Sequence, residues 1–126
     1  MDDVAAEIVR LLRQDAVIKR LVGARIGPEG ERAVAALPAI TYMLTGGLRE
    51  DPLEWPTWKM DVWATLDKPE HLQVLTDRID VVLDGVRLQT AAGRRVQYCR
   101  RESVWFDLPA TDGVRHRSST WRMATT

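Results

Sequence analysis

The stretch TWKMDVWATL, residues 57–66, alternates between two sets of side chains. Successive side chains of a β-strand point to opposite faces of a sheet, so this alternation predicts a strand. One face would carry Trp58, Met60, Val62, Ala64 and Leu66. The opposite face would carry Thr57, Lys59, Asp61, Trp63 and Thr65. We therefore predict a central strand that packs one face on the core and leaves the other face to water or a partner.

Two helices are predicted at the start of the chain. Apolar residues recur at helical spacing up to Gln14, which predicts a first helix. Asp15 can cap a second, shorter helix, and Gly23 can end it. Residues 23–36 are charged and contain glycine, so they are predicted to be a loop.

A strand and a long loop are predicted between these helices and the central strand. Residues 39–45 form an apolar run between Pro38 and a Gly-Gly pair, which favours a strand. Residues 46–56 contain two glycines and two prolines and are predicted to be a loop of eleven residues. A loop of this length exceeds a tight hairpin connection and suggests a contact loop with Trp55 as its anchor. The alternative is that Trp55 folds back on the core beside Trp58.

The clearest helix of the sequence follows the central strand, over about residues 68–84. Pro69 suits its first turn, and Gly85 suits its end. Its apolar stripe consists of Leu72, Leu75, Ile79, Val82 and Leu83. The remaining segments are predicted to be an edge strand over 86–90 and a long hairpin over 96–108 and 114–124, closed around 109–113. This order of elements predicts an α+β fold, a mostly antiparallel sheet with its helices packed on one face.

Length and composition fit a single domain over residues 1–126. The chain holds 18 basic and 18 acidic side chains, a balance that gives no overall attraction to nucleic acid or anionic membranes. Residues 94–126 hold seven arginines against three carboxylates, a local charge of +4. Cys99 is the only cysteine and the sequence begins without an apolar signal segment, so we expect synthesis in a reducing cytoplasm. The longest uncharged run, residues 33–48, is too short to span a membrane.

No residue set in the sequence has the spacing of a catalytic, cofactor or metal site. His71 and His116 lack a second histidine or cysteine at a ligand spacing, so we expect a solvated helix histidine and a strand-surface histidine. Cys99 is expected to be an inert, partly buried thiol. Three aspartates share one face of the helix after the central strand: Asp77, Asp80 and Asp84. We expect that face to be solvated, and we predict neither an enzyme nor a bound cofactor.

Arginines and aromatic residues alternate in the last predicted hairpin. They are Tyr98, Arg100, Arg101, Trp105, Arg115, Arg117, Trp121 and Arg122. Strands of this composition bind single-stranded nucleic acids, but the neutral net charge and the lack of lysine after Lys68 favour a protein interface. We expect the arginine-bearing positions to lie on the sheet face that the helices leave open. The side chains predicted for the interface are Arg49, Glu50, Trp55, Lys59, Trp63, Arg115 and Arg117.

Five segments, taken in order, carry a resemblance to a known protein family. They are LVGARI at 21–26, LPAITY at 37–42, KMDVWA at 59–64, VLDG at 82–85, and the arginine-rich strand pair that follows. In this order, and in a chain of this size, they resemble the tail terminator (tail completion) proteins of long flexible-tailed phages and phage-derived gene transfer particles. The likeness spans almost the whole chain. One position departs from the family pattern, because Gly27-Pro28 follows Arg25-Ile26 where the family often has an aromatic residue and proline.

The resemblance implies a structural virion protein at the neck-proximal end of a tail. Such a protein forms a ring, expected to be hexameric, that caps the head-proximal end of the tail tube and ends tube polymerisation. The implied partners are further copies of the chain, the tail tube protein and a neck or head–tail connector protein, with DNA passing through the lumen without specific recognition and no membrane involved. Assembly would take place in the cytoplasm of a bacterial host. The alternatives are another connector ring, a small nucleic-acid-binding domain that uses the arginine hairpin, and a small α+β enzyme with a site around His71, Asp77 and Asp80.

Overall fold

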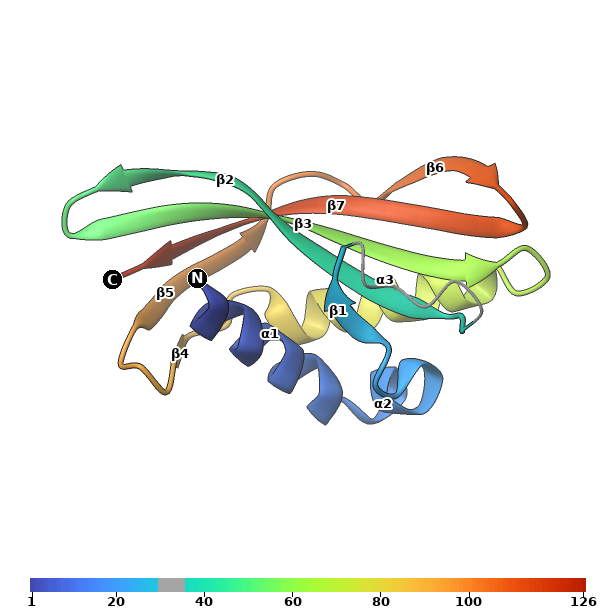
Figure 1. Ribbon diagram of the computed structural model, residues 1–126, viewed down its shortest axis with the longest axis horizontal. Helices are drawn as coiled ribbons and strands as arrows, with labels where there is room; N and C mark the ends of the chain where they lie inside the picture. The colour runs from blue at the N-terminus through green and yellow to red at the C-terminus, as the bar shows by residue number, and fades with distance from the viewer. Residues whose placement is uncertain (30–35) are drawn as a thin grey trace.

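The computed structural model describes residues 1–29 and 36–126, and Figure 1 shows how their helices and strands are arranged. The described elements are α1 (Asp2–Gln14), α2 (Ala16–Val22), β1 (Ile26–Pro28), β2 (Ala39–Glu50), β3 (Leu53–Thr65), α3 (Glu70–Leu83), β4 (Leu88–Gln89), β5 (Arg95–Arg101), β6 (Phe106–Thr111) and β7 (Val114–Thr125). The strands form one sheet in the order β1-β2-β3-β7-β5-β4. β6 also pairs with β7, along the first part of β7, while β5 pairs with its last part.

The sheet and the helices form two layers. In Figure 1 α1, α2 and α3 lie together on one side of the sheet, and no described helix lies on its other side. β1 and β2 pair in parallel, and the other strand pairs are antiparallel. The predicted α+β fold with helices on one face is therefore confirmed.

β3 lies in the middle of the sheet, between β2 and β7, as predicted for the central strand. Its alternate side chains Trp58, Met60, Val62 and Ala64 are buried in the core that the sheet shares with the helices. Leu66 lies beyond the end of β3 and is 45% exposed, so its predicted place in the core is wrong.

The helices form where the sequence predicts them. α1 buries Val4, Ile8 and Leu12 against the sheet, and α3 buries four residues of its predicted stripe, Leu72, Leu75, Ile79 and Leu83. Gly85 follows the end of α3 with a φ of +75°, a left-handed conformation that glycine adopts without the steric cost of a side chain. The end of α1 at Gln14 and the end of α3 before Gly85 therefore agree with the sequence pattern.

Asp15 joins the short helix α2 to α3. Its Oδ2 accepts a hydrogen bond of 3.1 Å from the backbone N–H of Ile18, which caps α2 as predicted. The guanidinium of Arg78 on α3 donates to the same carboxylate. Asp15 therefore helps to hold the first helical pair against the rest of the core.

We expect Asp15→Asn to lower the melting temperature at neutral pH and to matter little in acid. The hydrogen bond from Arg78 lowers the pKa of Asp15 against the opposing effect of burial. A carboxyl group whose pKa is lower in the folded state stabilises the fold above the unfolded-state pKa, and this stabilisation is lost as the pH falls through the folded-state pKa. Asn keeps the helix cap, so the thermal melts of the two proteins should begin to converge below about pH 4 and should coincide only below the lowered pKa of folded Asp15. Asp77→Asn on the exposed side of α3 is the control, and a gap that persists in acid would contradict the role of the Arg78 pair.

The predicted loop over residues 46–56 is wrong. β2 runs to Glu50 and β3 begins at Leu53, so the segment is a paired extension of the two strands that ends in a tight turn. Glycine and proline usually break strands, but here Gly47 lies opposite Pro56. A Cβ atom at Gly47 would lie 3.2 Å from the Cα atom of Pro56, so the glycine makes room for the proline. We call this paired extension, residues 46–57, the arm; it extends beyond the helices in Figure 1.

Two further predictions need correction. The segment 23–36 was predicted to be a loop, but it contains β1, and residues 30–35 of that prediction lie outside the described residues. The long hairpin is divided, because β5 and β6 are separate strands that pair with different parts of β7. Its tight turn lies at Asp112-Gly113, where both residues have positive φ values of 52° and 74°, which is typical of a two-residue hairpin turn.

Candidate assembly surface

The face of the sheet that points away from the helices, called here the open face, is built from residues that lie side by side in the strand register. Cross-strand partners lie on the same face of a sheet, so the positions of β3 identify their neighbours. Its central members are Thr41 and Met43 of β2, Lys59, Asp61 and Trp63 of β3, and His116, Ser118 and Thr120 of β7. Two predicted interface residues, Lys59 and Trp63, therefore lie on this face.

A buried aspartate lies at the centre of the open face. Asp61 is 0% exposed, although no helix among the described residues covers this side of the sheet. Its Oδ1 is 2.5 Å from Nε2 of His116, and the His116 ring stacks on Trp63 with ring centroids 3.7 Å apart. Trp63 in turn donates from its Nε1 to the hydroxyl of Thr41. His116 lies on the open face, as a strand-surface histidine would, but its side chain is only 13% exposed because Asp61 and Trp63 of the neighbouring strand contact it.

Lys59 connects this buried cluster to the edge of the sheet. Its Nζ lies 3.6 Å from Oδ2 of Asp61 and 3.1 Å from Oε1 of Glu29. Burial opposes the charged form, but the two carboxylates outweigh it and raise the pKa of Lys59. Lys59 is therefore a charged member of the open face whose charge is already compensated within the chain.

The arm contributes an aromatic pair to the open face. Trp55 is half-buried, and its ring lies 5.9 Å from that of Tyr98 on β5. Beside it a hollow of about 430 Å³ is lined by Gly47, Leu48, Glu50, Trp55, Thr57 and Arg122. Trp55 is thus part of a strand and packs on Tyr98. It lies neither in the predicted contact loop nor, as the alternative had it, in the core beside Trp58.

The tip of the arm carries the next two predicted interface residues. Arg49 and Glu50 are exposed at the end of β2, and Nε of Arg49 donates to Oδ1 of Asp51 across 3.1 Å. The side chains of this ion pair are 73% and 83% exposed, so the pair contributes little to stability. The tip is therefore a solvated, mixed-charge end of the arm.

Arg115 and Arg117 do not lie on the open face, so this prediction is wrong. Arg115 is the register partner of Ala64, and Arg117 is the partner of Val62, both of which face the core. Arg117 donates to Asp107 on β6 across 2.7 Å and to Gln73 on α3 across 3.1 Å. Arg117 therefore connects β6 and β7 to α3. The alternation of side chains along β7 places it on the helix side of the sheet, opposite to the face that we expected.

Other arginines of the C-terminal half are paired with carboxylates. The pairs are Arg100 with Asp84 at 3.1 Å, Arg101 with Asp80 at 3.1 Å, and Arg122 with Glu102 at 2.7 Å. An arginine whose charge is compensated attracts a phosphate backbone less than a free one does. This pairing weakens the interpretation of the hairpin as a nucleic-acid platform.

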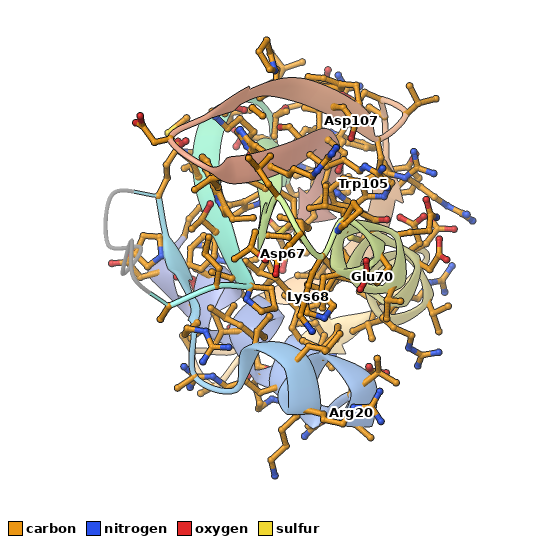
Figure 2. All side chains as sticks on the ribbon, turned by 90° about the vertical axis from the view of Figure 1, so that its right-hand side faces the viewer. Arg20, Asp67, Lys68, Glu70, Trp105 and Asp107 are labelled. Carbon is orange, nitrogen blue, oxygen red and sulfur yellow. The ribbon has the colours of Figure 1, made fainter. Side chains whose placement is uncertain are left out.

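Asp80 has structural partners that explain its place on α3. Its Oδ1 accepts hydrogen bonds from Nε of Arg101 and from Nε1 of Trp105. Figure 2 shows Trp105 between β6, marked by Asp107, and α3, marked by Glu70. The predicted solvated face of α3 is therefore wrong at Asp80, which connects the helix to the sheet.

The described residues offer little for chemistry at a site. Burial raises the pKa of the Cys99 thiol to about 12, and the side chain is fully buried, deeper than predicted. Within residues 1–29 and 36–126 no three histidine, cysteine, aspartate or glutamate side chains gather as a metal site would require. None of the described helices combines the length and apolar character needed to cross a membrane.

No protein-family model matches the chain, and no curated protein matches its sequence. The fold is similar to that of a chain in a solved structure described as "Virion of native gene transfer agent (GTA) particle". The TM-score is 0.73 at 14% sequence identity, and the match covers 94% of this chain and 90% of that chain. The two chains therefore share a fold over nearly their whole lengths.

Proposed function

We propose that this chain is a structural virion protein, of the tail terminator type, that forms a ring of about six copies at the head-proximal end of a tail tube. The ring would end tube polymerisation and join the tail to the neck, while DNA passes through its lumen without specific recognition. The protein would act through its surfaces and not as an enzyme.

The observation that carries this proposal is the fold shared with a chain of a gene transfer agent virion. The match leaves only a small part of either chain uncovered, so the similarity extends to the whole subunit. The resemblance of the ordered sequence segments to tail terminator proteins supports the same function independently.

The surfaces described above support an assembly protein. The open face carries Lys59, Trp63 and Trp55, and the arm extends it beyond the helices to Glu50. Arg49 lies at the tip on the other side of the arm, because its register partner is Glu54. Mixed polar and aromatic surfaces of this kind are typical of protein interfaces. Arg115 and Arg117 remain proposed interface residues, but they lie on the helix side of the sheet and not on the open face.

Another neck or connector ring is the closest alternative, since it would use the same kind of surface. A nucleic-acid-binding domain is less favoured, because carboxylates within the chain compensate Arg100, Arg101 and Arg122. A salt titration separates these two classes. DNA binding that weakens steeply with salt would favour the nucleic-acid class, whereas ring formation without DNA favours the assembly class.

We expect the protein alone to be monomeric or weakly associated and to become a closed ring when a tail tube protein is added. Contacts in a ring join two different patches, so an open oligomer keeps one free patch at each end until the ring closes. Absolute mass from light scattering, measured with and without the tube protein, tests this expectation. A stable two-fold dimer that the tube protein does not change would contradict the proposed function.

A further inference from the structure

Several strand edges of the sheet have no strand partner among the described residues, and two of them, those of β2 and β6, expose apolar side chains. β1 pairs with β2 only as far as Tyr42, which leaves the outer edge of β2 unpaired from Met43 to the end of the strand. β6 pairs with β7 on one side only. An unpaired edge presents backbone N–H and C=O groups that can pair with another strand.

Both edges expose apolar side chains on the same face of the sheet. Met43 and Leu48 of β2 are 40% and 60% exposed, and Phe106 of β6 is 43% exposed. The register places Met43 beside Lys59, Leu48 beside Trp55 and Phe106 beside Ser118, all on the open face. If a strand of another copy continued the sheet from one of these edges, its exposed apolar side chains would lie beside those of this copy on the open face.

The edge of β2 has a register shift between Leu44 and Gly46, but it lacks the charged and proline residues that usually keep a sheet edge solvated. No charged residue occurs between Tyr42 and Arg49, whereas protected edges carry lysine, proline or inward-pointing charge. On the other face, a hollow of about 410 Å³ lies beside the edge and is lined by residues that include Met1, Ala5, Leu44 and Trp58. A free edge with an apolar hollow beside it is the arrangement by which proteins bind an added strand, with the hollow receiving alternate side chains.

The occupant that fits the edge of β2 is the β6 edge of another copy. β2 is antiparallel to β3, β3 to β7 and β7 to β6, so β2 and β6 run in opposite directions at two different edges of one sheet. A neighbouring copy in the same orientation would present β6 antiparallel to β2, and the open face would continue from one copy to the next. Apolar side chains would meet on that face, Phe106 against Met43 or Leu48.

We propose that the β2 edge of one copy pairs with the β6 edge of the next, head to tail. The proposal rests on the proposed ring, because it names the contact between neighbouring subunits. Two different patches meet at such a contact, and the assembly closes into a ring when the rotation between copies closes.

Single-cysteine variants test this contact directly. Leu48→Cys and Phe106→Cys replace exposed side chains at the two edges, and the native Cys99 is buried. Leu48→Cys and Phe106→Cys chains are mixed in the presence of the tail tube protein, which is expected to drive ring formation, and are treated with a short bis-maleimide. We expect about tenfold more cross-linked dimer in the mixture than in either variant alone, because docked thiols react at an effective concentration far above bulk. Val81→Cys on α3, where Val81 is 66% exposed, is the matched control for an apolar position away from both edges.

The possible results separate the edge contact from the ring. Cross-linking of the mixture at or below the Val81→Cys level overturns the edge contact, and cross-linking of Leu48→Cys with itself overturns the head-to-tail arrangement. A double variant, Leu48→Cys with Phe106→Cys, should give a ladder of covalent multimers that stops at the ring size. A ladder that continues without closing would leave the edge contact standing and contradict the ring. Association measured by mass without edge cross-links would leave the ring standing and contradict the edge contact.

Discussion

Replacing Asp61 by Ala is expected to destabilise the protein by about 3 to 5 kcal/mol, as the loss of one partner from a buried pair does. The substitution leaves His116 without the carboxylate that it contacts at 2.5 Å, and it removes one of the two carboxylates beside Lys59. The fully buried site cannot supply water to replace these contacts without opening the sheet. Denaturant unfolding at neutral pH, followed by tryptophan fluorescence, measures the loss.

Two further variants make this test specific. Asp61→Asn keeps the shape and an oxygen acceptor, so its loss should be smaller, about 1 to 3 kcal/mol for a weakened hydrogen bond to a formerly charged group. Asp77→Ala removes an exposed carboxylate that accepts a hydrogen bond from Gln73, and it should change stability by less than about 0.5 kcal/mol. If Asp61→Ala is as stable as the parent, the cluster with His116 and Lys59 does not stabilise the open face.

Replacing Trp121 by Ala is expected to cost about 3 to 5 kcal/mol, the range of large aromatic truncations in cores. Trp121 is 0% exposed on β7, its Nε1 donates to the hydroxyl of Ser119 across 2.9 Å, and its ring packs edge-on against Trp105. The truncation removes both interactions and leaves a cavity where the sheet meets α3. Chemical denaturation followed by far-UV circular dichroism avoids dependence on the tryptophan signal that the variant loses.

Trp55→Ala is the matched control for this truncation. Trp55 is half-buried and packs on Tyr98, so its loss should be closer to the 0.5 to 1.5 kcal/mol of an aromatic pair plus the area it covers, about 2 kcal/mol in all. Equal losses in the two variants would place Trp55 in the core and remove it from the proposed assembly surface.

The fold could be predicted where a local pattern determines it. The alternation around Met60 identifies the core face of β3, and the stripe that begins at Leu72 identifies α3, because each pattern repeats with the period of its element. The cap at Asp15 and the stop at Gly85 are equally local. These features depend only on residues that are close together along the chain, so they can be predicted from the sequence.

The arm could not be predicted because its two unusual residues compensate each other across strands. Gly47 and Pro56 each argue against a strand when read along the chain, and only their pairing makes both acceptable. The candidate surface could not be predicted for the same reason, because its contacts depend on pairing between strands. His116 gains Asp61 and Trp63 through strand register, and Arg117 points to the helices for the same reason. A one-residue change in register would exchange the two faces, and no pattern within β7 fixes that register.

The position of β7 in the sheet has a consequence for how the chain is made. β3, β5 and β6 all pair with β7, and the partners are distant in sequence: Thr65 pairs with Val114, and Glu54 with Thr125. On the ribosome, the apolar face of β3 is therefore synthesised well before the strand that pairs with its second edge, and β5 and β6 also emerge without their common partner. Sheets built from such distant pairings fold slowly and expose unpaired edges while they wait. A nascent chain halted before residue 114 would be an aggregation-prone intermediate, and the release of β7 would be the step that commits the subunit to its native sheet.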